Sequence, residues 1–166
     1  MTRIQTDRLL LRLPNRDDDL SAFVADEEVQ RWLGGPATPE EMIRLWVNRW
    51  ARNGIGQFIV ELDGQFVGRV GFVVWDTRTW ETSSFDLAGE HAQVELGWAI
   101  LSPHWGHGYA SEAARAARSW LGADALISLI APENVRSQRV AEKLDAKRGE
   151  RVETPHGPAD IWIHPR

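Results

Sequence analysis

Three groups of residues have types and spacings that could do chemistry, and the turn Gly106-His107-Gly108 is the first. It lies between an apolar run and an alanine-rich segment with helical periodicity. Glycine lets the backbone approach a ligand closely, and the free N–H groups at a helix start favour an anion such as a phosphate. An isolated Gly-x-Gly is more often an ordinary turn, so other residues must decide its role.

The second group is Asn134 and Ser137, which follow a short apolar run and begin another helical pattern. In a structural role, Asn134 caps the helix by accepting a hydrogen bond from the Ser137 amide. In a functional role, both lie at the carboxyl end of a strand, where open α/β sheets bind ligands. The third group is Glu95, a carboxylate between two apolar residues. It is either a surface residue or a base directed into a cleft.

Other phosphate-binding motifs do not fit this chain. The glycine turn lacks the third glycine of a dinucleotide fingerprint, and no acidic residue follows a second strand about 20 residues later. The lysine of a P-loop is absent as well.

Hydrophobic periodicity predicts the elements that must position these groups. Strands are expected at 4–13, on both sides of the Asp63-Gly64 turn within 57–75, at 94–101, at 125–130 and in a hairpin around 154–158. Helices are expected after Asn15 with Asp17 to Asp19 in the first turn, from Thr38 to Asn53-Gly54, from Gly108 to Gly122, and after Asn134. Residues 34–38 and 76–92 are expected to be loops. Strict alternation places Glu95, Gly97 and Ala99 on one strand face.

The composition sets outer limits on function. The 166 residues fit one domain, 1–166, with 43% hydrophobic and 26% charged residues. A net charge of −5 disfavours a nucleic-acid partner, and no apolar run is long enough for a membrane span. The absence of cysteine excludes thiolate metal sites and fits a cytoplasmic protein. Nine tryptophans are many for this length, and we expect some to line a cleft.

Four segments in this order resemble those of the GCN5-related N-acetyltransferases (GNAT), in the branch of the RimJ and RimL ribosomal-protein N-terminal acetyltransferases. They are Thr-Asp-Arg-Leu-Leu-Leu-Arg at 6–12, Glu-Leu-Gly-Trp at 95–98, the segment 102–113 around the glycine turn, and 134–144. The resemblance implies an α/β protein with the GNAT fold, a single mixed and twisted β-sheet flanked by helices. It also implies acetyl-CoA as acyl donor, an amine as acceptor, no metal, and a monomer or homodimer.

The resemblance further implies roles for individual residues on the donor side. The backbone of the preceding strand, at Ala99, Ile100 and Leu101, would pair with the pantetheine arm. Asn134 and Ser137 would lie near the pantetheine and its thiol. The family's pyrophosphate loop maps onto Trp105, Gly106, His107, Gly108, Tyr109 and Ala110, and the loop amides as far as Ser111 would hold the pyrophosphate.

The implied reaction is direct attack of a neutral amine on the thioester. Glu95, acting through water, is the candidate base, and a backbone N–H within 98–100 would polarise the thioester carbonyl. Many family members use a tyrosine to protonate the leaving thiolate, but the only tyrosine here is Tyr109, inside the loop. Either Ser137 supplies the proton or the thiolate leaves unassisted.

Three functions remain open at this level. The first is an acetyl-CoA-dependent N-acetyltransferase, the second is a non-catalytic acyl-CoA-binding module, and the third is a nucleotide-binding regulator. For the enzyme, peptide N-termini, aminoglycosides, amino acids and polyamines are all open as acceptors. The acidic net charge favours a cationic acceptor, and the tryptophans favour one with an apolar part.

Overall fold

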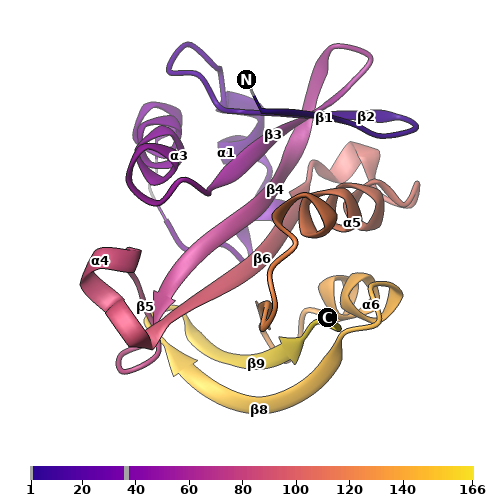
Figure 1. The fold of residues 1–166 in the computed structure, drawn as a ribbon. Coiled ribbons are helices and arrows are strands. Elements are labelled where there is room, and N and C mark those ends of the chain that lie inside the picture. The colour runs from indigo at the N-terminus through magenta and orange to yellow at the C-terminus, as the bar shows by residue number, and fades with distance from the viewer. Residues whose placement is uncertain (1, 36–37) are drawn as a thin grey trace.

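The computed structural model describes residues 2–35 and 38–166 and contains one mixed sheet with helices on both faces (Figure 1). The strands lie in the order β1-β2-β3-β4-β6-β7-β9-β8, and β5 pairs with β4. The pairing is antiparallel except between β6 and β7. The expected fold class, a single mixed sheet flanked by helices, is therefore confirmed.

The elements have the following bounds. The strands are β1 (Arg3–Gln5), β2 (Leu9–Arg12), β3 (Gln57–Leu62), β4 (Gln65–Asp76), β5 (Glu81–Thr82), β6 (Ala92–Ile100), β7 (Ile127–Ile130), β8 (Lys147–Thr154) and β9 (Gly157–Ile163). The α-helices are α1 (Ser21–Ala25), α2 (Glu27–Gln30), α3 (Pro39–Asn53), α4 (Phe85–Ala88), α5 (Tyr109–Leu121) and α6 (Val135–Lys143). Short 3-10 turns cover Gly89–His91 and Ser102–His104. Among the described residues, no helix is both long and apolar enough to cross a membrane.

The two faces of the sheet have separate cores, because side chains alternate along each strand. Phe58 and Val60 of β3 pack on the face that α5 covers with its alanines. Ile59, between them, packs on the opposite face with α1, α2 and α3. Figure 1 shows α1 and α3 on one side of β3 and β4, and α5 on the other.

Local signals predict several element ends correctly. Thr38 caps α3 by accepting from the Glu41 amide at 3.2 Å, and Gly54 ends the helix with a left-handed φ of 69°. The expected hairpins at Asp63-Gly64 and near the C-terminus are both present. Capping and turn residues act within a few positions in the sequence, so the sequence alone reveals them.

The expected single strand over 4–13 is wrong, because the chain forms two short antiparallel strands there. The Thr6 amide donates to the Leu9 carbonyl at 2.9 Å, and the Leu9 amide donates to the Thr6 hydroxyl at the same distance. These bonds close a tight turn. The turn brings Arg8 out of the sheet, and this position becomes important at the site.

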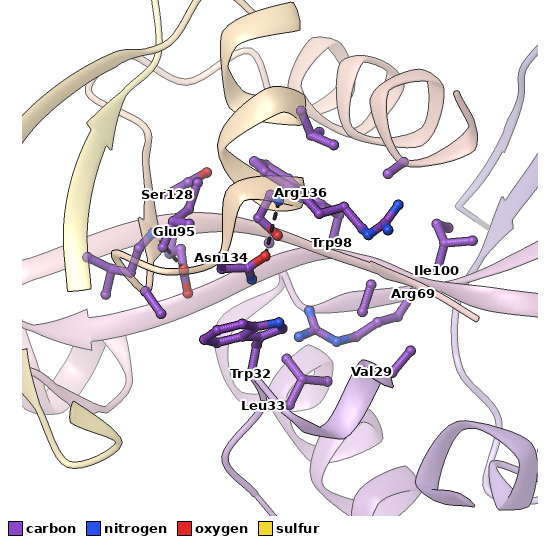
Figure 2. Close-up of a pocket in the computed structure, with 18 of the residues that line it drawn as sticks. Val29, Trp32, Leu33, Arg69, Glu95, Trp98, Ile100, Ser128, Asn134 and Arg136 are labelled. Atoms are coloured by element: carbon purple, nitrogen blue, oxygen red, sulfur yellow. Dashed lines mark hydrogen bonds between the residues drawn. The ribbon is translucent and has the colours of Figure 1, made fainter. Parts of the chain in front are cut away.

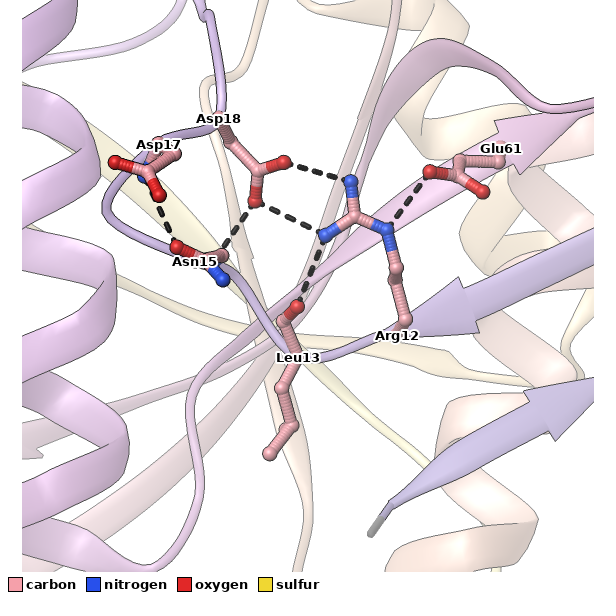
Figure 3. A network of polar contacts seen from close by, with 6 residues as sticks. All are labelled: Arg12, Leu13, Asn15, Asp17, Asp18 and Glu61. Atoms are coloured by element: carbon pink, nitrogen blue, oxygen red, sulfur yellow. Dashed lines mark hydrogen bonds and ion pairs between the residues drawn. The ribbon is translucent and has the colours of Figure 1, made fainter.

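The helix expected after Asn15 starts later than predicted, because α1 begins only at Ser21. Figure 3 shows the reason: Arg12 of β2 draws the Asp18 carboxylate back toward the sheet, with an Nη2–Oδ1 distance of 2.7 Å. Glu61 accepts from Arg12 Nε at 2.7 Å, and Asp18 also accepts from the Asn15 amide at 2.7 Å. The carboxylate that was expected in a helical first turn is thus used to fix a loop.

The other two expected loops have different outcomes. Residues 76–92 contain β5, α4 and a 3-10 turn, so the expectation of a structureless loop is wrong. These elements are only two to four residues long, too short to give a periodic pattern. In the loop expected over 34–38, Pro36 and Ala37 lie outside the described residues.

Candidate active site

The site begins where two neighbouring strands separate. Strands β6 and β7 run parallel but pair at only one position, Glu95 with Ile127. Beyond Glu95, the β6 edge that faces away from β4 has no strand partner among the described residues. A cavity of about 850 Å³ follows this open edge and extends to both faces of the sheet. We call the part next to α5 and α6 the donor half, and the part next to α2 and α3 the acceptor half.

In the donor half, the start of α5 presents unoccupied backbone donors. Its N-cap is Gly108, with φ of 79°, so the cap has no side chain to satisfy the first N–H groups of the helix. Gly106 has a φ of 83°, a conformation that also favours glycine. Tyr109, Ala110 and Ser111 form the first turn of α5 and line the cavity.

A brace from the N-terminal strands holds this turn in place. Arg8 Nη1 donates to the His107 carbonyl at 2.8 Å, and the Arg8 guanidinium lies 4.6 Å from the centre of the Tyr109 ring. Glu112 accepts from Arg8 Nε and the Thr6 hydroxyl, each at 2.7 Å. The segment Thr6-Asp7-Arg8 thus supports the glycine turn from the side away from the cavity. Tyr109 packs against Arg8, which is a structural role.

Trp105 closes the base of the donor half. Its Nε1 donates to the Ile100 carbonyl at 2.6 Å, and the Arg136 guanidinium lies 3.7 Å from the centre of its ring. The indole therefore ties the glycine turn to the end of β6. This hydrogen bond also means that the Ile100 carbonyl on the open edge already has a donor.

The backbone of β6 directs its donors and acceptors alternately to each side. Leu101 N–H donates to the Val67 carbonyl of β4 at 2.8 Å, so in this register the backbone of Ala99 also faces β4. The groups on the open edge consequently belong to Trp98 and Ile100. The expectation that Ala99 and Leu101 would offer backbone partners to pantetheine is therefore wrong.

Asn134 and Ser137 adopt the structural arrangement considered from sequence. The Ser137 amide donates to Asn134 Oδ1 at 3.2 Å, which caps α6. Both residues also line the cavity opposite the open edge of β6. Figure 2 shows Asn134 and Arg136 on the wall that faces Trp32 and Leu33.

Glu95 lies at the point where β6 and β7 separate. Its Oε2 accepts from the Leu129 amide of β7 at 2.9 Å, and its Oε1 accepts from Trp75 Nε1 at the same distance. Burial raises the pKa of the Glu95 carboxyl above its ordinary value, and the two N–H donors and two nearby arginines oppose that rise without cancelling it. Glu95 is therefore an anchored carboxylate inside the cavity and not a surface residue.

The cavity brings together most of the residues selected from sequence. Glu95, Ala99, Ile100, Trp105, Gly106, Gly108, Tyr109, Ala110, Ser111, Asn134 and Ser137 all line it. Leu101 and His107 do not: Leu101 packs in the core, and His107 turns its ring onto Tyr109.

The sequence singled out no individual residue of the acceptor half, although the expectation that some tryptophans line a cleft is confirmed by Trp32, Trp46 and Trp75. The side chains of this half include Arg49 of α3, Arg69 and Trp75 of β4, and Trp32 and Leu33 after α2. Arg69 is a cation within an otherwise apolar strand, and this was a usable signal. The remaining residues come from distant segments with no shared motif, so nothing in the sequence groups them.

Comparison with known proteins identifies the family. The model of the acetyltransferase (GNAT) domain matches residues 8–147, so the chain belongs to this family. The uncharacterized protein YkkB of Bacillus subtilis (strain 168) is 31% identical over 156 residues, which cover 86% of this chain and 84% of that protein.

Solved structures share the fold along the whole chain. An acetyltransferase from Agrobacterium tumefaciens str. C58 superposes with a TM-score of 0.76 and 25% identity, covering 100% of this chain and 95% of the other. The aminoglycoside acetyltransferase AAC(6')-Ib, solved with an aminoglycoside and acetyl-CoA, gives a TM-score of 0.75 at 20% identity, with 96% and 94% covered. At that identity the likeness shows the fold alone.

Proposed function

We propose that this protein is an N-acetyltransferase that moves the acetyl group of acetyl-CoA directly to a primary amine. The observation that carries the proposal is one continuous cavity, which leads from the free amides of α5 along the open edge of β6 to Glu95. Membership of the GNAT family supports acetyl transfer as the reaction. The four matching sequence segments support the finer assignment to the RimJ/RimL branch.

Each end of the cavity has a role in this proposal. The amides between Gly106 and Ser111 hold the pyrophosphate, where a helix start and two glycines favour an anion. The pantetheine arm pairs with the backbone N–H and C=O of Trp98 and the N–H of Ile100, since the Ile100 carbonyl already accepts from Trp105. One of these N–H groups also donates to the thioester oxygen as negative charge develops there.

The amine attacks the thioester carbon, the C–N bond forms, and the C–S bond breaks. A proton from the amine passes through water to Glu95, whose raised pKa makes it a better base than an exposed carboxylate. Ser137 gives a proton to the departing thiolate and regains one from solvent, or the thiolate leaves unassisted. Replacing Ser137 by Ala decides between these: a lower kcat with an unchanged KM for acetyl-CoA assigns the proton to Ser137.

The test is turnover of acetyl-CoA with a panel of amines, followed as free thiol and as N-acetyl product by mass spectrometry. We expect both products in equal amounts. Saturable CoA binding with no turnover of any amine would instead identify an acyl-CoA-binding module. Binding of ATP or NAD far tighter than CoA in calorimetry would overturn the proposal in favour of a nucleotide-binding regulator.

A further inference from the structure

The acceptor half contains two arginines that have no acidic partner. No carboxylate oxygen of the described residues lies within 4.0 Å of either Arg49 or Arg69. Arg69 Nη1 donates to Gln57 Oε1 at 3.0 Å, and the Arg49 side chain makes no hydrogen bond to the described part of the chain. The other arginines that line the cavity are exposed, whereas Arg49 and Arg69 are partly buried.

The Arg69 guanidinium lies against the backbone of β6. A Cβ on Gly97 would lie 3.3 Å from Arg69 Nη1, so the guanidinium rests directly over the backbone of β6 at this glycine. Gly97 is two residues from Glu95 on the same strand face, a separation of about 7 Å. Figure 2 shows the Arg69 guanidinium directed into the cavity, toward the wall with Trp32 and Leu33.

The positive charges of Arg49 and Arg69 exceed the negative charge of Glu95 in the acceptor half. Glu95 already accepts from Trp75 and Leu129 and faces both arginines at longer range. Burial, followed by the charge of Arg49, lowers the pKa of Arg69 to about 10 against the opposing charge of Glu95, and burial also lowers the pKa of Arg49. Both guanidinium groups stay protonated at neutral pH, as arginines do in proteins. Two cations therefore face one anion in a partly buried space, where an unpaired charge is costly.

We propose that Arg49 and Arg69 bind a carboxylate of the acceptor, so that the substrate is an amino acid or a similar small amine with its carboxylate close to the amine. This inference rests on the proposed function for the identity of the reaction. A carboxylate accepts two parallel bonds from a guanidinium, and it would supply the missing negative charge. The amine of such a molecule then lies toward Glu95, about one strand repeat away.

The walls around the arginines indicate the rest of the substrate. Trp32, Leu33, Trp46 and Val73 line this half and offer apolar surface. An amino acid with an apolar side chain fits this lining better than a polyamine or an aminoglycoside, whose additional cations would meet Arg49 and Arg69.

The experiment compares matched acceptors that differ only at the carboxylate: leucine with leucinamide, and phenylalanine with phenylalaninamide. We expect kcat/KM to be about 10- to 100-fold higher for the acids. Because an amino-acid amide has the less basic amine, it would be the faster substrate without a carboxylate site. Equal or faster turnover of the amides, or of a peptide that begins with leucine, would overturn the inference.

Variants assign the effect to the two arginines. Arg49→Gln and Arg69→Gln should each reduce the preference for the acid at least tenfold and leave the KM for acetyl-CoA unchanged. Arg69→Lys, which retains the charge and is less disruptive to folding, should keep part of the preference. Arg52→Gln is the matched control on the same helix, because Arg52 is exposed and pairs with Asp86. An unchanged preference in all the Arg49 and Arg69 variants would contradict the inference.

Direct binding separates this inference from the proposed reaction. Leucine is titrated calorimetrically into the CoA-loaded wild type and into Arg69→Gln. If no amine is acetylated but leucine binds the wild type and not the variant, acetyl transfer fails and the carboxylate site stands. If amines are acetylated and leucine binds neither protein, the carboxylate site fails and the transfer stands.

Discussion

The donor and acceptor halves of the cavity are built in different ways. The donor half is mostly backbone: a glycine turn, the free amides of α5 and the open edge of β6, all within residues 98–111. The acceptor half is made of side chains from α2, α3 and β4, which are spread over residues 28–75. Backbone donors suit a ligand part that many enzymes share, whereas side chains can be exchanged to change the acceptor.

The two halves meet at the junction of β6 and β7, which is fastened on both faces of the sheet. On the acceptor face, the Glu95 carboxylate accepts from the Leu129 amide. On the other face, the Ser128 hydroxyl donates to the Leu96 carbonyl and contacts His164 Nε2 at 2.8 Å. Fixing the strands here lets them separate just beyond, so the position of the reaction centre depends on this junction.

The largest effect should come from Glu95, the acidic group shared by the junction and the acceptor half. Glu95→Gln should lower kcat/KM by roughly 10²- to 10⁴-fold, the usual contribution of a positioned base. The acid limb of the wild-type pH–rate profile should lie above the ordinary range of a carboxyl, because burial raises the pKa of Glu95. CoA affinity, measured by calorimetry, should stay near wild type. An unchanged rate would remove Glu95 as the base.

The next effect tests the donor half. Gly108→Glu should weaken CoA binding by about 100-fold or more, since it adds backbone strain and places a carboxylate near the phosphates. Gly64→Glu is the matched control, with a φ of 77° in the β3–β4 turn against 79° for Gly108. Equal CoA affinity in Gly108→Glu and the control, by calorimetry, would mean that the glycine turn does not bind the pyrophosphate.

A third, smaller effect concerns the stability of the junction itself. Burial, followed by the charge of Arg118, lowers the pKa of His164 to about 4. The unfolded chain binds a proton at His164 near pH 6.5, but the folded chain does so only near pH 4. The free energy of unfolding should therefore fall by roughly 1–3 kcal/mol as the pH drops between these values.

The measurement for this third effect is denaturant unfolding across the same pH range. His164→Gln should show a shallower fall than the wild type, and His91→Gln, at a partly exposed site, should follow the wild type. A wild-type curve that runs parallel to that of His164→Gln would contradict the assignment.

The smallest effect concerns Arg8, which supports the glycine turn of the donor half. Arg8→Gln removes the bond to the His107 carbonyl and the contact with the Tyr109 ring. Because Arg8 is partly exposed, we expect CoA affinity to fall only about two- to fivefold. Arg3→Gln, on the exposed strand β1, should leave CoA affinity unchanged in the same titration. A loss as large as that of Gly108→Glu would mean that Arg8 contacts CoA directly.

Sequence reasoning succeeded where neighbouring residues determine the structure. The Thr38 cap, the Gly54 and Gly122 helix ends and the terminal hairpin follow from local hydrogen bonds and left-handed backbone positions. It failed at Asn15, where Arg12 and Glu61 on two strands take Asp18 out of a helical turn. A contact across 49 residues, such as Arg12 with Glu61, leaves no local pattern.

The overall charge of the chain and the charges inside the acceptor half favour different acceptors. A net charge of −5 favours a cationic substrate, yet two arginines face a single carboxylate in the acceptor half. Net charge averages over the entire surface, whereas a buried site responds to the few charges around it.

The sequence by itself determined the order of most elements, the family resemblance and the glycine turn, because these depend on short segments and on periodicity. Only the tertiary structure decided that β6 and β7 separate at Glu95, that the backbone of Trp98 and the N–H of Ile100 face the open edge, and that Arg69 rests over Gly97. These features arise from strand register and from contacts between distant segments. They exist only once the sheet has formed and fixed which side chains face the same cavity.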